Sequence, residues 1–188
     1  STLFPYTTLF RSITAPLERL GMTAENGLVA TILHDIGEQP GTLPLLQYTL
    51  TELFEKREGL TLTLDAYKAT GGILGTLASR AEEIYNSLTS QGQALTRQLF
   101  LRMVTLGEGT EDTRRRVLLA EFRTLGDETL VEDVLNAFAQ YRLLTMDRDP
   151  LTRGPTVEIA HEALIREWSR MREWLNESRE EVRLQRQL

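Results

Sequence analysis

Apolar residues recur at intervals of three or four along most of the chain, which is the spacing that places them on one face of an α-helix. The first series runs from Thr23 toward Gly37. A second begins at Thr42, whose hydroxyl suits a helix N-cap, and Pro44 occupies its first turn, where the missing N–H costs nothing. Three further helices are expected. A short one starts at Thr63 and runs through LDAYKAT until Gly71-Gly72 interrupts it, a longer one follows with inward-facing residues from Leu74 to Leu88, and another runs from about Gln93 to Leu106. The first half of the chain therefore predicts a helical bundle.

The pattern changes at Gly107. A loop rich in Gly and Thr precedes the segment RRRVLL, which we expect to be extended, and a helix from about Glu128 to Tyr141. RLLTMDRD and TVEIAH are typical of short strands, and the Pro and Gly residues of PLTRGP between them predict a β-hairpin. A last amphipathic helix carries apolar residues from Leu164 to Val182. Helix, helix, strand, turn and strand, in this order, predict a winged-helix domain.

The predicted fold is thus mainly α, with a helical bundle, a winged-helix domain that contains a small β-hairpin, and a C-terminal exit helix. The expected domains are residues 13–106, 107–170 and 171–188. Residues 2–12 read TLFPYTTLFRS, which resembles residue for residue one translated frame of a common sequencing-library adapter. We expect residues 1–12 to be a disordered artefact, with a natural arm as the alternative, and the natural protein to continue upstream of Ile13. EEVRLQRQL ends without a helix stop signal, so we also expect the linker helix to be truncated.

Composition narrows the class of protein. The 188 residues are 41% hydrophobic and 26% charged, as in ordinary soluble globular proteins, and no apolar run approaches the roughly 20 residues of a membrane span. The absence of cysteine excludes disulfides and thiolate metal sites and fits a cytoplasmic address. A net charge of −6 argues against a broad nucleic-acid surface, and two histidines leave little room for a histidine-built metal centre.

GEGTEDTRRRV, residues 107–117, is the stretch that most suggests phosphate chemistry. A phosphate loop needs a buried strand before it and a helix after it, whose free N–H groups point at the anion. Here a predicted helix precedes, an extended segment follows, and no G-x-x-x-x-G-K-[ST] pattern exists in the chain. The interpretation is a solvated linker or an edge strand. Three nearby carboxylates are expected to neutralise the arginines locally: Glu108, Glu111 and Asp112.

Two histidines and one proline are the candidate site residues. His34-Asp35 resembles a metal-binding pair, but its further ligands are missing, so a helix-end histidine is the simpler interpretation. HEALIREW has Ile165 where a zinc-protease helix needs its second histidine. His161 closes a predicted strand and opens a helix, where its imidazole either donates to a bound phosphate or makes a local hydrogen bond. Pro44 is either a first-turn proline or a rigid apolar surface for a flat ring such as adenine.

Two other function classes remain as alternatives. In a DNA-binding transcription regulator the helix DETLVEDVLNAFAQYR would enter the groove, but it has four carboxylates and no basic residue before Arg142, so phosphates would repel it. A helical protein-interaction scaffold would use Trp168 and Trp174 as its docking face. Those indoles share a stripe with Leu164 and Leu175, which favours at least partial burial.

Three phrases in order carry a family resemblance: PGTLPLLQYTLTELFEKREGLTLTLDAYKATGGILGTLASRAEEIY, GEGTEDTRRRV and VEIAHEALIREWSRMREWL. They resemble the C-terminal part of the novel-STAND NTPase module of bacteria, which is often followed by WD-repeat propellers. The resemblance covers residues 13–188. It implies an upstream ATPase core with the phosphate loop and the acidic magnesium-binding motif, over which a helical domain and a winged helix close.

The resemblance also implies roles for single residues. Pro44 resembles the helical-domain proline that packs on adenine, and His161 resembles the winged-helix histidine that contacts the β-phosphate of ADP and holds the resting state closed. ATP in place of ADP would release that contact. The implied cofactor is ATP or ADP, with magnesium held by the core. The implied partners are that core, a downstream WD-repeat or other sensor or effector domain, and further copies on oligomerisation, without nucleic acid or membrane.

The family pattern assigns no role to the arginine run. The chain also lacks the phosphate loop and the Walker B carboxylates, so we expect no metal site and no ATP hydrolysis by these 188 residues alone.

Overall fold

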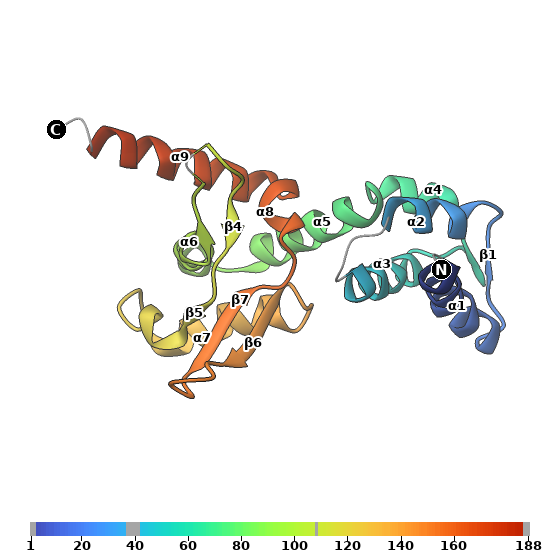
Figure 1. Cartoon of the computed structure of the whole chain (residues 1–188), viewed down its shortest axis with the longest axis horizontal. Helices are drawn as coiled ribbons and strands as arrows, with labels where there is room; N and C mark the ends of the chain where they lie inside the picture. Colours follow the sequence, from blue (N-terminus) through green and yellow to red (C-terminus); the bar gives the residue numbers. More distant parts are fainter. Residues whose placement is uncertain (1–2, 37–41, 108, 186–188) are drawn as a thin grey trace. The chain divides into compact units, whose positions relative to one another are not determined.

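The structure is a computed structural model that describes residues 3–36, 42–107 and 109–185 (Figure 1). The chain is mainly helical with small sheets of two or three strands, which confirms the predicted fold class. It divides into two compact units, Ser1–Thr76 and Leu77–Leu188, which are described one at a time. This division lies earlier in the chain than the domain boundary predicted after residue 106. The helix of residues 90–102 contacts helices of the second unit, so it belongs there.

The first unit is built from helices and one short pair of strands. Its helices are α1 Leu3–Arg19, α2 Leu28–Ile36, α3 Thr42–Glu55, α4 Leu64–Ala69 and the start of α5 Gly72–Ser87. The strands β1 Thr23–Ala24 and β2 Thr61–Leu62 pair in parallel. Helix α2 therefore begins later than the Thr23 predicted from sequence, because the strand pairing and Gly27, with φ of 86°, interrupt the helical backbone.

Residues 3–12 form the first part of α1, which differs from the disordered arm that we expected. The helix packs against α2 through Ile13 and Leu17, which are buried. Toward the N-terminus the hydroxyls of Ser12 and Thr14 donate to the carbonyl oxygens of Thr8 and Phe10, one turn earlier. Residues 3–12 thus continue the packed helix toward the N-terminus, as cooperative helix propagation allows.

Local signals in the first unit correspond closely to the structure. Thr63 is the N-cap of α4, and its hydroxyl accepts from the amide of Ala66 at 3.2 Å. Gly71 and Gly72, with φ of 75° and 73°, separate α4 from α5 as predicted, because a left-handed backbone suits glycine. Leu74, predicted to face inward, is instead 40% exposed.

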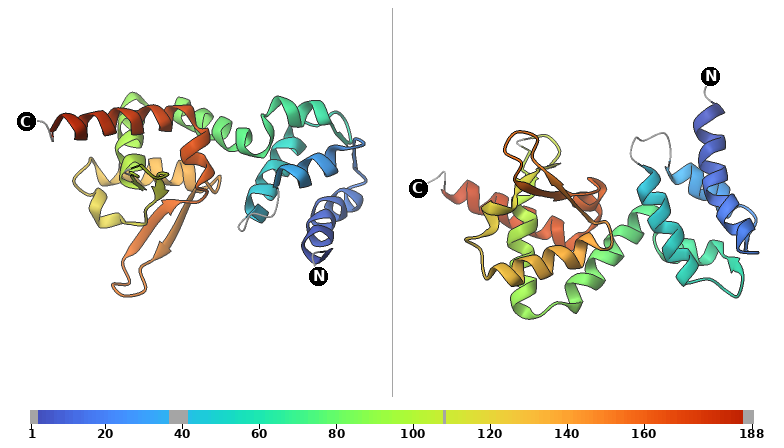
Figure 2. Two further views of the ribbon diagram at one scale, coloured as in Figure 1. Left: turned by 45° about the horizontal axis from the view of Figure 1, so that its top comes forward. Right: turned by 90° about the horizontal axis from the view of Figure 1, so that it is seen from below.

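The second unit contains the rest of α5 and the C-terminal elements. These are α6 Ser90–Arg102, β3 Val104–Thr105, β4 Thr113–Arg114, β5 Val117–Leu118, the 3₁₀ turn η1 Leu119–Phe122, α7 Glu128–Ala139, β6 Leu144–Arg148, β7 Pro155–Ile159, α8 Ala163–Glu167 and α9 Ser169–Gln185. Strands β3 and β4 form an antiparallel pair, and a three-stranded antiparallel sheet has the order β5-β7-β6. The predicted hairpin is confirmed as β6 and β7 (Figure 2).

Trp168 is the centre of the second unit's core. The final helix of the prediction is in fact two, because Trp168 takes an extended backbone with ψ of 107° between α8 and α9. Its indole is 2% exposed and lies against Phe100 and Trp174, with ring centroids 5.4 and 5.3 Å away. Trp174 is also buried, at 6% exposure, so these indoles do not form the docking face of the scaffold alternative. Val182 belongs to α9, but its side chain lies outside the described residues.

The same indole meets a carboxylate at the edge of the core. Its Nε1 donates to Oε2 of Glu82 at 2.7 Å, and Arg170 donates to both oxygens of that carboxylate. The hydrogen bonds from Arg170 lower the pKa of Glu82 below its ordinary value, in opposition to burial. An ionised carboxylate therefore connects α5 to the start of α9.

We predict that Trp168→Phe lowers the free energy of unfolding by about 1–3 kcal/mol, because it removes the indole hydrogen bond and leaves a gap among the rings. Urea unfolding followed by circular dichroism measures this change. Leu151→Ala is the control, since Leu151 is 92% exposed and should change stability by less than about 0.5 kcal/mol. Equal effects of the two substitutions would contradict the assignment of Trp168 to the core.

Candidate functional site

The glycine-rich stretch connects the two strands of a hairpin. Thr105 in β3 pairs with Thr113 in β4, and the described residues between them, 106, 107 and 109–112, lie outside both strands. The amide of Gly107 donates to Oδ1 of Asp112 at 2.9 Å, and a Cβ on Gly107 would overlap the carbonyl oxygen of Thr110. Glycine is needed here for the close turn. Since a strand follows and not a helix, the loop lacks the geometry of a phosphate loop.

The carboxylates beside the arginine run bind other arginines. Glu111 pairs with Arg166 at 3.4 Å, and Asp112 pairs with Arg179 of α9. The prediction that these two acids neutralise the run is therefore wrong, because the hairpin directs them toward α8 and α9. Glu108, the third predicted acid, lies outside the described residues.

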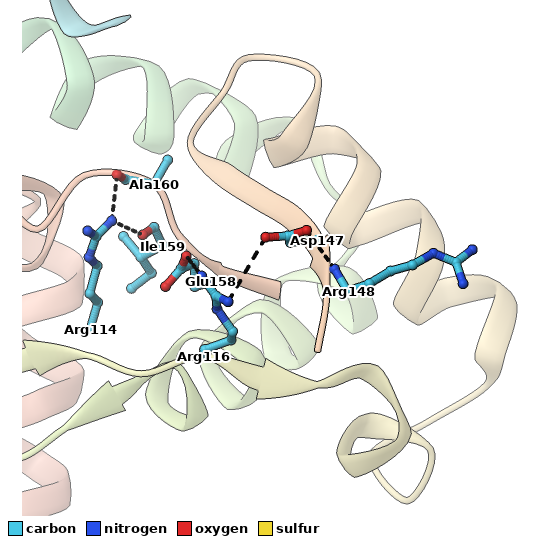
Figure 3. Close-up of polar contacts among 7 residues, drawn as sticks. All are labelled: Arg114, Arg116, Asp147, Arg148, Glu158, Ile159 and Ala160. Atoms are coloured by element: carbon cyan, nitrogen blue, oxygen red, sulfur yellow. Dashed lines mark hydrogen bonds and ion pairs between the residues drawn. The ribbon is translucent and has the colours of Figure 1, made fainter. Parts of the chain in front are cut away.

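Two arginines of the run have carboxylate partners of their own. Arg115 donates to Glu121 at 3.0 Å and to the carbonyl oxygen of Arg102. Arg116 donates to Glu158 at 2.9 Å and lies 4.0 Å from Asp147 (Figure 3). Both side chains thus connect the β4–β5 segment to neighbouring elements.

Arg114 is placed differently. Its Nη1 donates to the carbonyl oxygens of Ile159 at 3.3 Å and of Ala160 at 3.0 Å, at the end of β7 (Figure 3). Its amide donates to Oε1 of Glu162 at 3.4 Å. Arg114 therefore contacts residues on both sides of His161 in the sequence, through its side chain before it and through its amide after it.

His161 follows β7 and is half-buried. Its carbonyl oxygen accepts from the amide of Leu164, which holds the turn into α8. Burial lowers the pKa of the imidazole from its ordinary 6.5, the charge of Arg114 lowers it further, and a hydrogen bond to the main chain of Arg142 acts in the opposite direction. The one N–H of the neutral imidazole is donated to the main chain of Arg142, so the other ring nitrogen is an acceptor, which can donate to a phosphate oxygen once it has taken up a proton.

Sequence reasoning identified His161 but not Arg114. Three consecutive arginines look alike in the sequence, and nothing in their order selects the first. The selection comes from the pairing of β5 with β7, in which Val117 lies opposite Val157 and brings the run to the end of β7.

Pro44 is the third residue of α3 in the first unit, within the first turn as predicted. Its side chain lies outside the described part of the chain, so its proposed contact with a flat ring stays a prediction. Asp35 accepts from the hydroxyl of Tyr67 at 2.7 Å, and burial and this acceptor raise the pKa of the phenol. Asp35 thus has a structural partner. No group of three or more metal-binding side chains occurs among the described residues.

Two hollows in the second unit have less suitable chemistry. The first, of about 510 Å³, is lined by four carboxylates and one arginine: Glu82, Glu83, Glu167, Glu173 and Arg170. The second, of about 500 Å³, contains Glu111 and Asp112 with their partners Arg166 and Arg179, together with Glu167 and Arg172. An anion would meet repulsion in the first hollow, and in the second it would meet three carboxylates beside the three arginines. The turn at His161 remains the candidate site.

Comparison with known proteins identifies a family. The sequence model of a protein family described as Novel STAND NTPase 1 matches residues 5–188, which includes His161, Pro44 and part of the adapter-like segment. No curated protein and no solved structure matches the chain. Within the described residues, no helix has the length and hydropathy needed to cross a membrane.

We predict that His161 makes folding pH-dependent. The folded chain binds a proton at His161 less readily than the unfolded chain, whose imidazole titrates near 6.5. As the pH falls below 6.5, the unfolded chain gains this proton first, so the free energy of unfolding decreases. Well above 6.5 neither state carries the proton, so the stability of the folded chain is not reduced by His161.

Urea unfolding between about pH 7.5 and about pH 5.5 measures this dependence. His161→Gln should lose that part of it, whereas His34→Gln, which keeps His161, should retain it. An unchanged pH dependence in His161→Gln would contradict the prediction.

Proposed function

Since the chain belongs to the Novel STAND NTPase 1 family, we propose that it acts as the regulatory lid of a signal-transducing ATPase switch. In this proposal a helical domain and a winged-helix domain close over a nucleotide held by an upstream P-loop core. The observation that carries the proposal is the half-buried His161, placed at the end of β7 beside the guanidinium of Arg114.

The geometry suits a contact with the terminal phosphate of ADP. The imidazole is held neutral by burial and by Arg114, and an incoming phosphate would offset the charge of Arg114 and favour the imidazolium. A charge-assisted hydrogen bond of this kind contributes about 1.5–3 kcal/mol. A ligand shifts a two-state equilibrium only through contacts that differ between the states, so loss of this contact with ATP would favour the open lid.

The remaining parts of the proposal follow the family. Pro44 packs on adenine, and the core supplies magnesium and any ATP hydrolysis, so the 188 residues by themselves are not catalytic. The downstream partner is a WD-repeat or other sensor or effector domain, and the complete protein can oligomerise in the cytoplasm. Within the second unit, α8 and Trp168 follow His161 along the chain and lead directly into α9. A change at the proposed phosphate contact would therefore act on the C-terminal helix through a short segment.

A DNA-binding regulator is the rival function. The carboxylates expected to oppose phosphates are all exposed on α7 or at its N-cap: Asp127, Glu128, Glu132 and Asp133. The two arginines that follow Arg114 are paired with carboxylates. Both observations weigh against a DNA surface and support the nucleotide switch.

We predict that genomic sequence upstream of this chain encodes a strand followed by G-x-x-x-x-G-K-[ST] and then an acidic strand end, the parts that bind phosphates and magnesium. Sequencing the source DNA with library adapters trimmed tests this. An open reading frame that begins near Ile13 would remove the nucleotide role and leave a stand-alone adaptor.

In the protein extended through that core, we predict that His161→Ala accelerates release of a fluorescent ADP analogue roughly tenfold or more, through loss of the phosphate contact. Stopped-flow fluorescence measures the rate. His34→Ala is the matched control, because His34 lies exposed in α2 and has no proposed contact with nucleotide. Equal release rates in the two variants would contradict a role for His161.

A further inference from the structure

Arg114 differs from its two neighbours in having no carboxylate partner among the described residues. Arg115 and Arg116 each bind a glutamate near 3 Å, with distances of 3.0 and 2.9 Å. Among the described residues, the guanidinium of Arg114 donates through Nη1 alone, to the carbonyl oxygens of Ile159 and Ala160. Its Nε and Nη2 make no hydrogen bond within the described part of the chain. Its charge is thus not neutralised by the contacts that position it.

The unused atoms form one edge of the guanidinium. Nε–H and an Nη2–H point the same way and are spaced to donate in parallel to two oxygens of one phosphate or carboxylate. The two carbonyl contacts through Nη1 hold the planar group in place. This lowers the loss of side-chain conformational entropy when a ligand binds. Arg114 therefore presents a pre-oriented fork beside the turn that contains His161.

His161 and Arg114 lie where a charged imidazole is disfavoured. Burial of the ring opposes the imidazolium, and the guanidinium of Arg114 opposes it further. An anion placed between the two groups would reverse the effect, because it attracts both. The arrangement is therefore complementary to a doubly charged group with several oxygens.

We propose that Arg114 and His161 together bind one terminal phosphate, with the Nε–Nη2 edge of Arg114 on two oxygens and the imidazole N–H on the same group. The ligand class is a diphosphate, as the end of a nucleoside diphosphate or as free pyrophosphate. This inference rests on the proposed phosphate contact of His161 and adds the residue that supplies the positive charge.

Two neighbouring groups modify the site. Glu162 lies in the same turn, with Oε1 3.4 Å from the amide of Arg114, and its charge weakens the attraction of an anion. The main chain of Arg142 accepts a hydrogen bond from the imidazole, which orients the ring. Diphosphate binding must therefore be favoured by protonation of His161. The pKa of the imidazole then reports whether the site is occupied.

Proton NMR of the histidine rings tests the inference on the 188-residue chain, with millimolar pyrophosphate as the probe. The chain has two histidines, and His34→Gln assigns the signal of His161. In the wild type, pyrophosphate should raise the pKa of His161. Arg114→Gln should raise that pKa without pyrophosphate, by removing the repulsion, and should weaken pyrophosphate binding roughly tenfold or more.

Arg116→Gln is the matched control, because it removes the same charge two positions along but from a side chain paired with Glu158. It should keep the wild-type response. Equal weakening by the two variants would overturn the inference in favour of general electrostatic attraction, while the phosphate contact of His161 would stand. No response of His161 in the wild type would instead overturn the phosphate contact and the inference with it.

Arg114→Lys covers the case in which Arg114→Gln does not fold, as judged by circular dichroism. Lysine keeps the charge but cannot donate along a planar edge, so we expect the pKa of His161 to stay low and pyrophosphate to bind several-fold more weakly. Full wild-type affinity in Arg114→Lys would overturn the role of the guanidinium fork.

Discussion

The buried indole of Trp168 and its hydrogen bond to Glu82 are the contact on which the second unit depends. The backbone leaves the helical region at Trp168 because the ring enters the core there, and this separates α8 from α9. The ring then lies against aromatic side chains of α5, α6, α7 and α9. Burial of a large ring is favourable, but its N–H needs an acceptor, and the Glu82 carboxylate, itself paired with Arg170, provides one.

The arginine run, residues 114–116, connects neighbouring elements, and the free energy of its exposed ion pairs is not its main contribution. Such pairs contribute little stability, since solvent screens them and long side chains lose entropy. The run instead connects the β4–β5 segment to four places: the end of β7 through Arg114, α6 and η1 through Arg115, and the β6–β7 hairpin through Arg116. The contacts of Arg114 and Arg116 add to the strand pairing of β7 with β5 and β6, which is what positions β7 and the turn that follows it.

The proposed phosphate contact at His161 and the core at Trp168 are close in sequence within this unit. A ligand that changes the turn at His161 acts on α8, whose last residue is followed by Trp168 and then by α9. Because interiors are close-packed, a shift of so short a helix is resisted by the rings around Trp168 or is transmitted to α9. If the chain acts as the lid proposed above, this packing fits a switch with two arrangements better than one with continuous movement.

Much of the fold follows from local sequence signals. Helical spacing, the Thr63 cap, the Gly71-Gly72 break and the β6–β7 hairpin were predicted, because each depends on residues within one or two turns. Helix in residues 3–12, the pairing of β1 with β2 and the break at Trp168 were not, since tertiary contacts decide them.

The sequence by itself determined a mainly helical chain with a C-terminal hairpin and His161 at a strand end, and it identified the family resemblance. Only the tertiary structure decided that Arg114, and not Arg115 or Arg116, lies beside that histidine. The physical reason is distance along the chain: Arg114 and Ile159 are 45 positions apart, and Glu82 and Trp168 are 86 apart. Strand register and core packing bring such residues together, and no local periodicity encodes either.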